Sequence, residues 1–211
     1  MTEASRATGD SAIGDVVVAF NQGQKAVIKT YMIDRAGQTK SLRAAEAVLD
    51  VSIVLDRPAS AVWPVFRNFD SWMNRFGYVW EGLPFENENK FVYLKFRSSA
   101  NDAKSGDEGP KSKYVVRKVI PGQLVYFDSQ PVPLPGKDGV WSGHNLMAMH
   151  EENGRTTISV LMEHTWYSET MSFEELHADA KGALGGAVAF WRDYFVPDLI
   201  SLVETGRANA A

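Results

Sequence analysis

The clearest alternation of apolar and polar side chains in the chain begins at Leu49. Four apolar residues, Leu49, Val51, Ile53 and Leu55, are separated by single residues that are mostly polar. A repeat of two is typical of a β-strand that turns one face toward a core. Pro58 follows, and its fixed backbone angle and missing N–H favour a turn. The sequence therefore predicts a strand that ends shortly before Pro58.

Two short helices are predicted after this strand. Ser60 can cap the first helix, and Pro64 removes a backbone donor inside it, so this helix is expected to be short or kinked. The second helix carries Trp72 and Phe76. The apolar residues of the first helix are Val62, Trp63 and Phe66.

Alternating runs return six times after the helices. They read GYVWEG, KFVYLKFRS, KYVVRKVI, QLVYFDSQ, HNLMAMHEE and RTTISVLMEHTW. With the first strand they predict a seven-stranded antiparallel sheet.

Two long breaks interrupt these runs. Residues 98–112 are polar and charged, and we expect them to be mobile. Residues 130–143 are rich in proline and glycine and include Trp141. This second break is interpreted either as a lid over a pocket or as a surface connector.

A long helix is predicted for the C-terminal segment, residues 173–204. Ser172 and Glu175 have the spacing of a capping box at its start. Gly182, Gly185 and Gly186 lie in its middle, where each glycine costs about 1 kcal/mol relative to alanine. We interpret them as sites of close packing or a kink, ahead of ligand contact. The predicted apolar stripe of the helix is Leu176, Ala180, Leu184, Ala187, Trp191, Tyr194, Asp198 and Leu202.

The N-terminal part of the chain divides into a tail and an extension. Residues 1–12 are small and polar, which predicts disorder. In residues 13–45 the apolar positions have helical spacing, so a helix is favoured; a hairpin formed by VVVAF and KAVIKTYMI is the competing interpretation. The apolar surface of the extension needs a partner, and we expect a homodimer.

The start of residues 46–206 resembles the START/SRPBCC superfamily, whose members include polyketide cyclase-like proteins. The resemblance rests on the strand, on the sequence DRPASAVW from Asp56 to Trp63, and on Asp70 followed by Trp72. It implies an α+β helix-grip fold, in which a seven-stranded antiparallel sheet wraps around a long C-terminal helix and a ligand cavity opens between them. The superfamily includes lipid carriers, hormone receptors, chaperone activators, cyclases and lyases, so the resemblance leaves the function open.

Composition and charge exclude several classes of function. The net charge is −4 and the Lys and Arg residues are scattered along the sequence, so no cluster of positive charge suggests binding of nucleic acid. No apolar run is long enough to cross a membrane, and the polar start lacks a signal sequence, so a cytoplasmic protein is expected. The chain has no cysteine, and the spacing of its four histidines predicts no metal site and no metal cofactor.

The last hairpin can be given a register from its turn. The pair Asn153-Gly154 favours a tight turn, which places Glu152 opposite Arg155 and His144 opposite Glu163. One face then carries Asn145, Met147, Met149, Ile158, Val160, Met162, His164 and Trp166, and this more apolar face is assigned to the cavity. A slip of one residue would instead bring His144 and Glu163 to the cavity.

Candidate site residues follow from this register and from the aromatic content. His164 is the candidate for proton transfer, because a free imidazole has a pKa of about 6.5. Tyr114 and Tyr167 are candidate proton donors, and Asn145 is placed to hold a ligand oxygen. The remaining candidate ligand contacts are Trp80, Tyr93, Trp141, Met147, Met149, Met162, Trp166, Leu184 and Trp191.

These observations predict a protein that binds a hydrophobic, aromatic small molecule in an enclosed cavity. The leading hypothesis adds conversion of that molecule by acid–base chemistry without a cofactor, as in a lyase, cyclase or dehydratase. The alternative is a carrier or sensor that performs no chemistry. A third class, a protein-interaction module, would instead expose an apolar patch.

Overall fold

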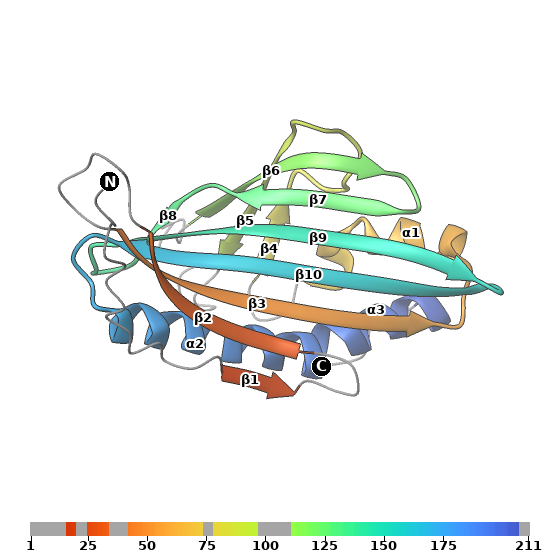
Figure 1. The fold of residues 1–211 in the computed structure, drawn as a ribbon. Helices are drawn as coiled ribbons and strands as arrows, with labels where there is room; N and C mark the ends of the chain where they lie inside the picture. The colour runs from red at the N-terminus through yellow and green to blue at the C-terminus, as the bar shows by residue number, and fades with distance from the viewer. Residues whose placement is uncertain (1–15, 20–24, 34–41, 74–77, 97–110, 207–211) are drawn as a thin grey trace, which may run out of the picture.

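The computed structural model describes residues 16–19, 25–33, 42–73, 78–96 and 111–206 (Figure 1). Over these residues the chain forms a ten-stranded sheet in the order β1-β2-β3-β10-β9-β7-β6-β5-β4, and β8 pairs with β9 beside this path. All of the paired strands run antiparallel. The strands are β1 (Val16–Ala19), β2 (Lys25–Ile33), β3 (Leu42–Leu55), β4 (Tyr78–Glu81), β5 (Phe91–Phe96), β6 (Lys111–Ile120), β7 (Leu124–Ser129), β8 (Val132–Pro133), β9 (Val140–Glu152) and β10 (Arg155–Ser168).

All seven strands predicted from the alternating runs are present, and the α+β helix-grip architecture is confirmed. The predicted helix in residues 13–45 is wrong. β1 and β2 form an antiparallel hairpin there, and β2 pairs with β3 along its full length. The runs VVVA and KAVIKTYMI are rich in β-branched residues, and pairing with β3 satisfies their backbone groups, which decides between the two interpretations.

The boundary predicted at residue 45/46 is also corrected, since it falls inside β3 (Leu42–Leu55). The extension is therefore part of the same sheet as the rest of the chain. The homodimer stays a prediction, and the tail of residues 1–12 lies outside the described residues.

The first short helix predicted after β3 is present as α1 (Ala59–Phe66); the second is only a 3₁₀ turn, η1 (Phe69–Ser71), which ends before Trp72. Ser60 does not cap α1, because the helix begins at Ala59, two residues earlier than a Ser60 cap requires, and Pro58 occupies the N-cap position. The carboxylate of Glu151 on β9 takes over this role, since its Oε2 accepts a hydrogen bond of 2.8 Å from the backbone N–H of Ala59. Phe76, predicted in the second helix, lies outside the described residues.

The C-terminal helix runs through α2 (Phe173–Phe190), the π-helical turn η4 (Trp191–Phe195) and α3 (Val196–Thr205). The predicted capping box is present: Ser172 Oγ accepts from the N–H of Glu175 at 3.2 Å, and Glu175 Oε2 accepts from the N–H of Ser172 at 2.8 Å. The wide turn of η4 shifts the phase of the helix. As a result Phe195 and Leu199 are buried, although the predicted stripe did not include them. Tyr194 and Leu202, which the predicted stripe did include, are only half-buried.

The interpretation of the three helix glycines as close-packing sites or a kink is wrong. A methyl group built on Gly182, Gly185 or Gly186 would meet nothing within 4 Å. α2 continues through all three positions, and the irregularity begins only at Trp191.

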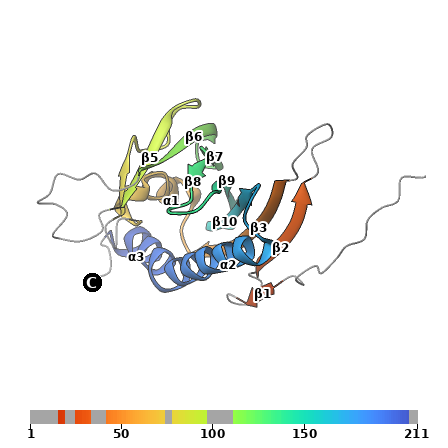
Figure 2. The same ribbon diagram turned by 90° about the vertical axis from the view of Figure 1, so that its left-hand side faces the viewer.

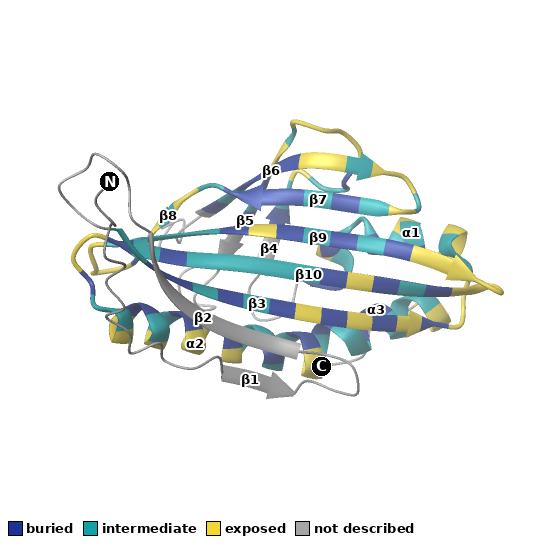
Figure 3. Cartoon of the chain, viewed as in Figure 1, coloured by how far each residue is buried: buried dark blue, intermediate teal, exposed yellow. Residues whose placement is uncertain are grey.

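The core lies between the sheet and the C-terminal helix. Figure 2 shows the sheet curving over α2 and α3, with α1 closing one end. Figure 3 shows burial that alternates along β3, as the period of two predicts. Phe69 is the centre of an aromatic cluster, with its ring centroid 4.7–6.0 Å from those of Phe66, Trp72, Trp80, Phe85 and Phe127. None of the described helices has the length and apolar character to cross a bilayer.

Candidate ligand cavity

A cavity of about 380 Å³ lies between the inner face of the sheet and the C-terminal helix. Its walls come from both layers, with residues from the strands on one side and from α2 and η4 on the other. They are Met73, Trp80, Leu94, Ser112, Tyr114, Phe127, Trp141, Asn145, Met162, His164, Ala183, Gly186, Ala187, Phe190, Trp191 and Phe195.

No Asp, Glu, Lys or Arg occurs among the described residues that line this cavity. The polar groups of the wall are few, namely Ser112, Tyr114, Asn145 and His164, besides the indole nitrogens. An apolar wall with a small number of polar groups is the usual form of a site for a small organic molecule. A hollow of about 30 Å³ adjoins the cavity beside His164; it is lined by Ala47, Leu49, Met162, His164, Trp166, Ala183, Leu184 and Ala187.

The predicted register of the last hairpin is confirmed. Glu152 pairs with Arg155, and His144 pairs with Glu163. Asn145 and His164 therefore face the cavity, and the slip by one residue is excluded. His144 and Glu163 lie on the outer face of the sheet, where they border a shallow groove with Tyr126, Leu146 and Leu161.

A chain of hydrogen bonds links His164 to the backbone of β7. Nδ2 of Asn145 donates to the carbonyl oxygen of Phe127 at 3.4 Å. Oδ1 of Asn145 lies 3.3 Å from Nε2 of His164. Asn145 is only 1% exposed, so its amide is held by these two partners instead of by solvent. This chain fixes the orientation of the only imidazole that lines the cavity, among the described residues.

Burial, and to a smaller extent the charge of His144 across the sheet, lower the pKa of His164 to about 4. The imidazole of His164 is therefore neutral at pH 7. The expectation of a pKa of about 6.5, on which the proton-transfer role rested, is thus corrected. A neutral imidazole can still donate one hydrogen bond and accept another.

The ring of His164 lies directly against the backbone of Gly143, its partner across the β9–β10 pair. A methyl group at Gly143 would approach Cδ2 of His164 to 2.1 Å and Nε2 to 2.7 Å. Glycine is therefore required here for the ring to keep its place. The ring centroids of Trp141 and Trp166 lie 5.3 Å and 6.2 Å from that of His164.

The cavity brings together many of the predicted site residues. Tyr114, Trp80, Trp141, Asn145, Met162, His164 and Trp191 line it. Trp166 and Leu184 line only the adjoining hollow. Met147 and Met149 are buried on the inner face but line neither space, because they lie farther along β9 toward the turn.

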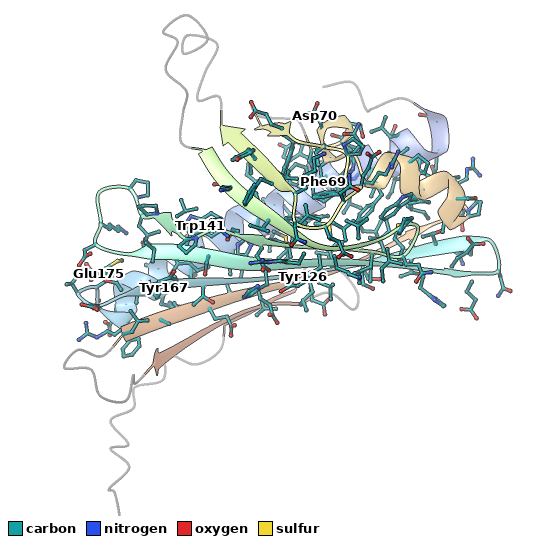
Figure 4. All side chains as sticks on the ribbon, turned by 90° about the horizontal axis from the view of Figure 1, so that it is seen from above. Phe69, Asp70, Tyr126, Trp141, Tyr167 and Glu175 are labelled. Carbon is teal, nitrogen blue, oxygen red and sulfur yellow. The ribbon has the colours of Figure 1, made fainter. Side chains whose placement is uncertain are left out.

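Two further predicted residues, Tyr167 and Tyr93, are absent from the cavity wall. Tyr167 follows the buried Trp166 on β10, so its side chain turns to the other face, where it borders an open groove near Gly139. Tyr93 precedes Leu94 on β5, and Leu94 is the residue that lines the cavity. Figure 4 shows Trp141 and Tyr167 toward the end of the sheet near Glu175, and Phe69 and Asp70 toward the other end.

Several lining residues were not predicted from the sequence. Phe127 and Leu94 have a signal, since each lies two residues from a buried valine of its own strand, Val125 or Val92, and alternation then places it on the inner face. For Gly186, ligand contact was the second of the two interpretations of the helix glycines. Ala183 and Phe190 have no signal, because which side of α2 faces the cavity depends on how the helix packs. The other unpredicted lining residues are Met73, Ser112, Ala187 and Phe195.

The interpretation of residues 130–143 as a lid is wrong. Trp141 belongs to β9, and none of residues 130–140 lines the cavity. The turn between β8 and β9 is instead tied to its neighbours: Leu134 N–H donates to the carbonyl of Gly139 at 2.8 Å, and Lys137 Nζ lies 2.5 Å from Asp179 Oδ1 on α2. Most of the first break, residues 97–110, lies outside the described residues.

Among the residues that the structure describes, no group of three or more His, Asp or Glu side chains is arranged to hold a metal ion. Two buried polar atoms in this part of the chain lack a hydrogen-bond partner, Nε1 of Trp80 and Nε2 of His177. Trp80 belongs to the cavity wall.

Comparison with solved structures finds proteins of similar structure. A protein from Arthrobacter aurescens is 12% identical, with a TM-score of 0.50 over 78% of this chain and 89% of that one. Protein MLL2253 from Mesorhizobium loti is 13% identical, with a TM-score of 0.49 over 76% and 98% of the two chains. DynU16, from the dynemicin biosynthetic locus, is 16% identical, with a TM-score of 0.46 over 76% of this chain and 48% of its own.

These likenesses are at the level of the fold alone. No protein-family model matches the chain. No curated protein matches it in sequence. The chain is therefore defined as an α+β protein with a helix-grip-like sheet and helix, and its function has to be argued from the cavity.

Proposed function

We propose that the protein binds a hydrophobic, aromatic small molecule in the cavity between the sheet and the C-terminal helix. The observation that carries this proposal is a partly open cavity of about 380 Å³ with an apolar, aromatic wall and one oriented polar pair, His164 and Asn145.

The size and chemistry of the wall support an aromatic ligand. Pockets of about 300–1,000 Å³ hold small organic molecules and bury most of their surface. Trp80, Tyr114, Phe127 and Trp191 offer ring faces and edges, and aromatic pairs add about 0.5–1.5 kcal/mol beyond the burial of their area. Met73 and Met162 can adapt to the outline of a ligand, because their side chains are unbranched and flexible.

Binding without chemistry, by a carrier or sensor, is favoured over conversion. A base works best when its pKa is near the working pH, and His164 has a pKa of about 4. One observation keeps acid–base conversion as a second candidate: Tyr114 and His164 line the same cavity, and His164 is neutral and can accept a proton. If a bound compound is turned over, His164→Gln should abolish turnover while keeping binding, and full activity in this variant would exclude the role.

Two neighbouring glycines offer a matched test of binding. Gly186 lines the cavity, whereas Gly185 is exposed and lines neither the cavity nor its adjoining hollow. Both have open space around the position of a Cβ. Leucine is a better helix former than glycine, so neither Gly186→Leu nor Gly185→Leu should impair folding.

We expect Gly186→Leu to fill part of the cavity and to weaken binding by about 5-fold to 150-fold, because overpacking of a filled site costs about 1–3 kcal/mol. Gly185→Leu should bind as the wild type does. Ligands are found by thermal-shift screening of phenols, polyketides and lipids, and affinities are measured by calorimetry. Equal weakening in both variants, or no stabilisation by any compound, would contradict the proposal.

A further inference from the structure

We infer that the cavity selects an uncharged ligand with a hydrogen-bond donor, such as a phenol hydroxyl, and that Nδ1 of His164 is the acceptor. The inference rests on the proposed binding function. It adds the chemical class of the ligand and the residue that recognises it.

The tautomer of His164 follows from the chain of hydrogen bonds. The carbonyl of Phe127 can only accept, so the group of Asn145 that faces it at 3.4 Å must be the NH₂ group. The oxygen of the same amide then faces His164, and an amide oxygen also only accepts. Nε2 of His164, 3.3 Å away, must therefore carry the hydrogen. In a neutral ring this leaves Nδ1 with a free lone pair.

The position of the ring makes this assignment stable. The edge with Cδ2 and Nε2 lies against the backbone of Gly143, and no side chain larger than hydrogen would fit between them. Trp141 flanks the ring at a centroid distance of 5.3 Å. A ring flip would turn Nε2 away from Asn145 and leave the amide oxygen unpaired, which is costly at a site that is only 1% exposed. The edge with Nδ1 therefore points away from β9.

Nδ1 of His164 is available to a ligand. It makes no hydrogen bond to another described residue. His164 is partly exposed and borders both the cavity and its adjoining hollow. Burial also keeps the ring neutral at pH 7, since the pKa of His164 is lowered to about 4.

The charge of the ligand follows from the rest of the wall. None of the described lining residues is acidic or basic, so an ionised carboxylate or amine would lose its hydration without gaining a partner. A phenol, in contrast, presents an apolar ring to the aromatic wall and a single donor to His164. This match sets the ligand class apart from fatty acids and from aliphatic amines.

The first test compares two probes that differ in one hydrogen-bond donor, 2-naphthol and its methyl ether, 2-methoxynaphthalene. We expect the wild type to bind the naphthol about tenfold more tightly than the ether, as one net hydrogen bond predicts. His164→Phe keeps a planar ring beside Gly143 but removes the acceptor, so this variant should bind the two probes about equally. His144→Gln, on the outer face, is the matched control and should keep the wild-type preference.

The outcomes separate this inference from the proposed function. Equal binding of both probes to the wild type overturns the selection by donor but leaves hydrophobic binding intact. An unchanged preference in His164→Phe overturns the role of His164. Binding of neither probe overturns both.

The second test requires no ligand. In the protein labelled with ¹⁵N-histidine, long-range ¹H–¹⁵N spectra at pH 7 report the tautomer of each imidazole. We expect His164 to carry its hydrogen on Nε2, and His164→Gln identifies its signals. A hydrogen on Nδ1, or a doubly protonated ring at pH 7, would overturn the inference whatever the probes show.

Discussion

His164 and His144 lie on neighbouring strands but on opposite faces of the sheet. His164 pairs with Gly143, and His144 pairs with Glu163, one position further along, so their side chains point in opposite directions. The inner histidine, His164, has neutral partners and a pKa of about 4. The side chain of the outer histidine, His144, is 60% exposed, and its Nδ1 lies 2.8 Å from Oδ1 of Asp128.

The outer face around His144 is a network of charges. Nε of Arg117 lies 2.7 Å from Oδ2 of Asp128, and the hydroxyl of Tyr126 lies 3.4 Å from Nδ1 of His144. Burial raises the pKa of Asp128, but hydrogen bonds from His144, Arg117 and Tyr126 outweigh burial and hold this pKa below its usual value. Burial, together with the hydrogen bond to Asp128, raises the pKa of Tyr126.

The comparison shows how one sheet separates two kinds of chemistry. On the outer face water solvates the charges, so carboxylate, guanidinium and imidazole can gather. On the inner face a charge would be costly, so the polar groups there are neutral and are paired with one another. The alternation of side chains is the whole physical cause of the separation, because each residue is assigned to a face by its position in the strand.

Substitutions of two neighbouring residues of β3 should give the largest difference in the free energy of unfolding between the inner and the outer face. Ile53 is 2% exposed on the inner face, and Val54 is 53% exposed on the outer face. Ile53→Ala should lower the free energy of unfolding by about 2–5 kcal/mol, because it leaves a void in the core. Val54→Ala should change it by less than about 1 kcal/mol. Urea denaturation followed by circular dichroism measures both, and similar losses would show that the outer face is covered.

The burial of His164 should make the free energy of unfolding depend on pH. The folded-state pKa of His164, about 4, lies below its unfolded value of 6.5, so between these values the unfolded chain binds more protons. Its contribution to stability is therefore full above pH 6.5 and is lost as the pH falls toward 4. From pH 7 to pH 5 the loss should be about 2 kcal/mol.

The check is urea denaturation at pH 7, 6 and 5 of the wild type, His164→Phe and His144→Gln. His164→Phe lacks the titrating group, so its stability should fall by about 2 kcal/mol less over this range than that of the wild type. His144→Gln should keep the slope assigned to His164. Parallel curves for the wild type and His164→Phe would mean that the ring stays solvated in the folded state.

The register behind this contrast could be predicted from the sequence. Asn153-Gly154 fixed the turn of the last hairpin, and the alternation then placed Asn145 and His164 on one face. The same rule could have excluded Tyr167 and Tyr93, since each is adjacent in its strand to a buried or lining residue, Trp166 or Leu94.

Other parts of the structure depend on contacts that a linear pattern does not contain. The apolar spacing between Ile13 and Tyr31 fits a helix and a strand equally, and pairing of β2 with β3 decides the outcome. The π-helical turn at Trp191–Phe195 changes which residues of the helix face the sheet. The lowered pKa of His164 follows from burial by the completed fold, so the residue could be chosen from the sequence but its protonation state could not.

Asp128 gives the smallest expected effect, on the outer face. Asp128→Asn removes the charge that faces Arg117 and His144 but keeps the shape of the side chain, so it should lower the free energy of unfolding at pH 7 by about 1 kcal/mol. Asp56→Asn is the matched control, because the Asp56–Arg155 pair is far more exposed, at 73% and 61%, and its loss should cost less than about 0.5 kcal/mol.

The pKa of Asp128 is lowered in the folded state, so its contribution is present above its unfolded value of 3.8 and is lost as the pH falls through the lower folded value. Asp128 itself therefore takes up no proton between pH 7 and pH 5, where the difference between the wild type and His164→Phe changes. Added salt should also shrink the Asp128 difference, because water and ions reach the outer face, and should leave the His164 difference unaltered. A salt-independent Asp128 effect would mean that this charge network is as shielded from solvent as the cavity, and the contrast between the two faces would then no longer hold.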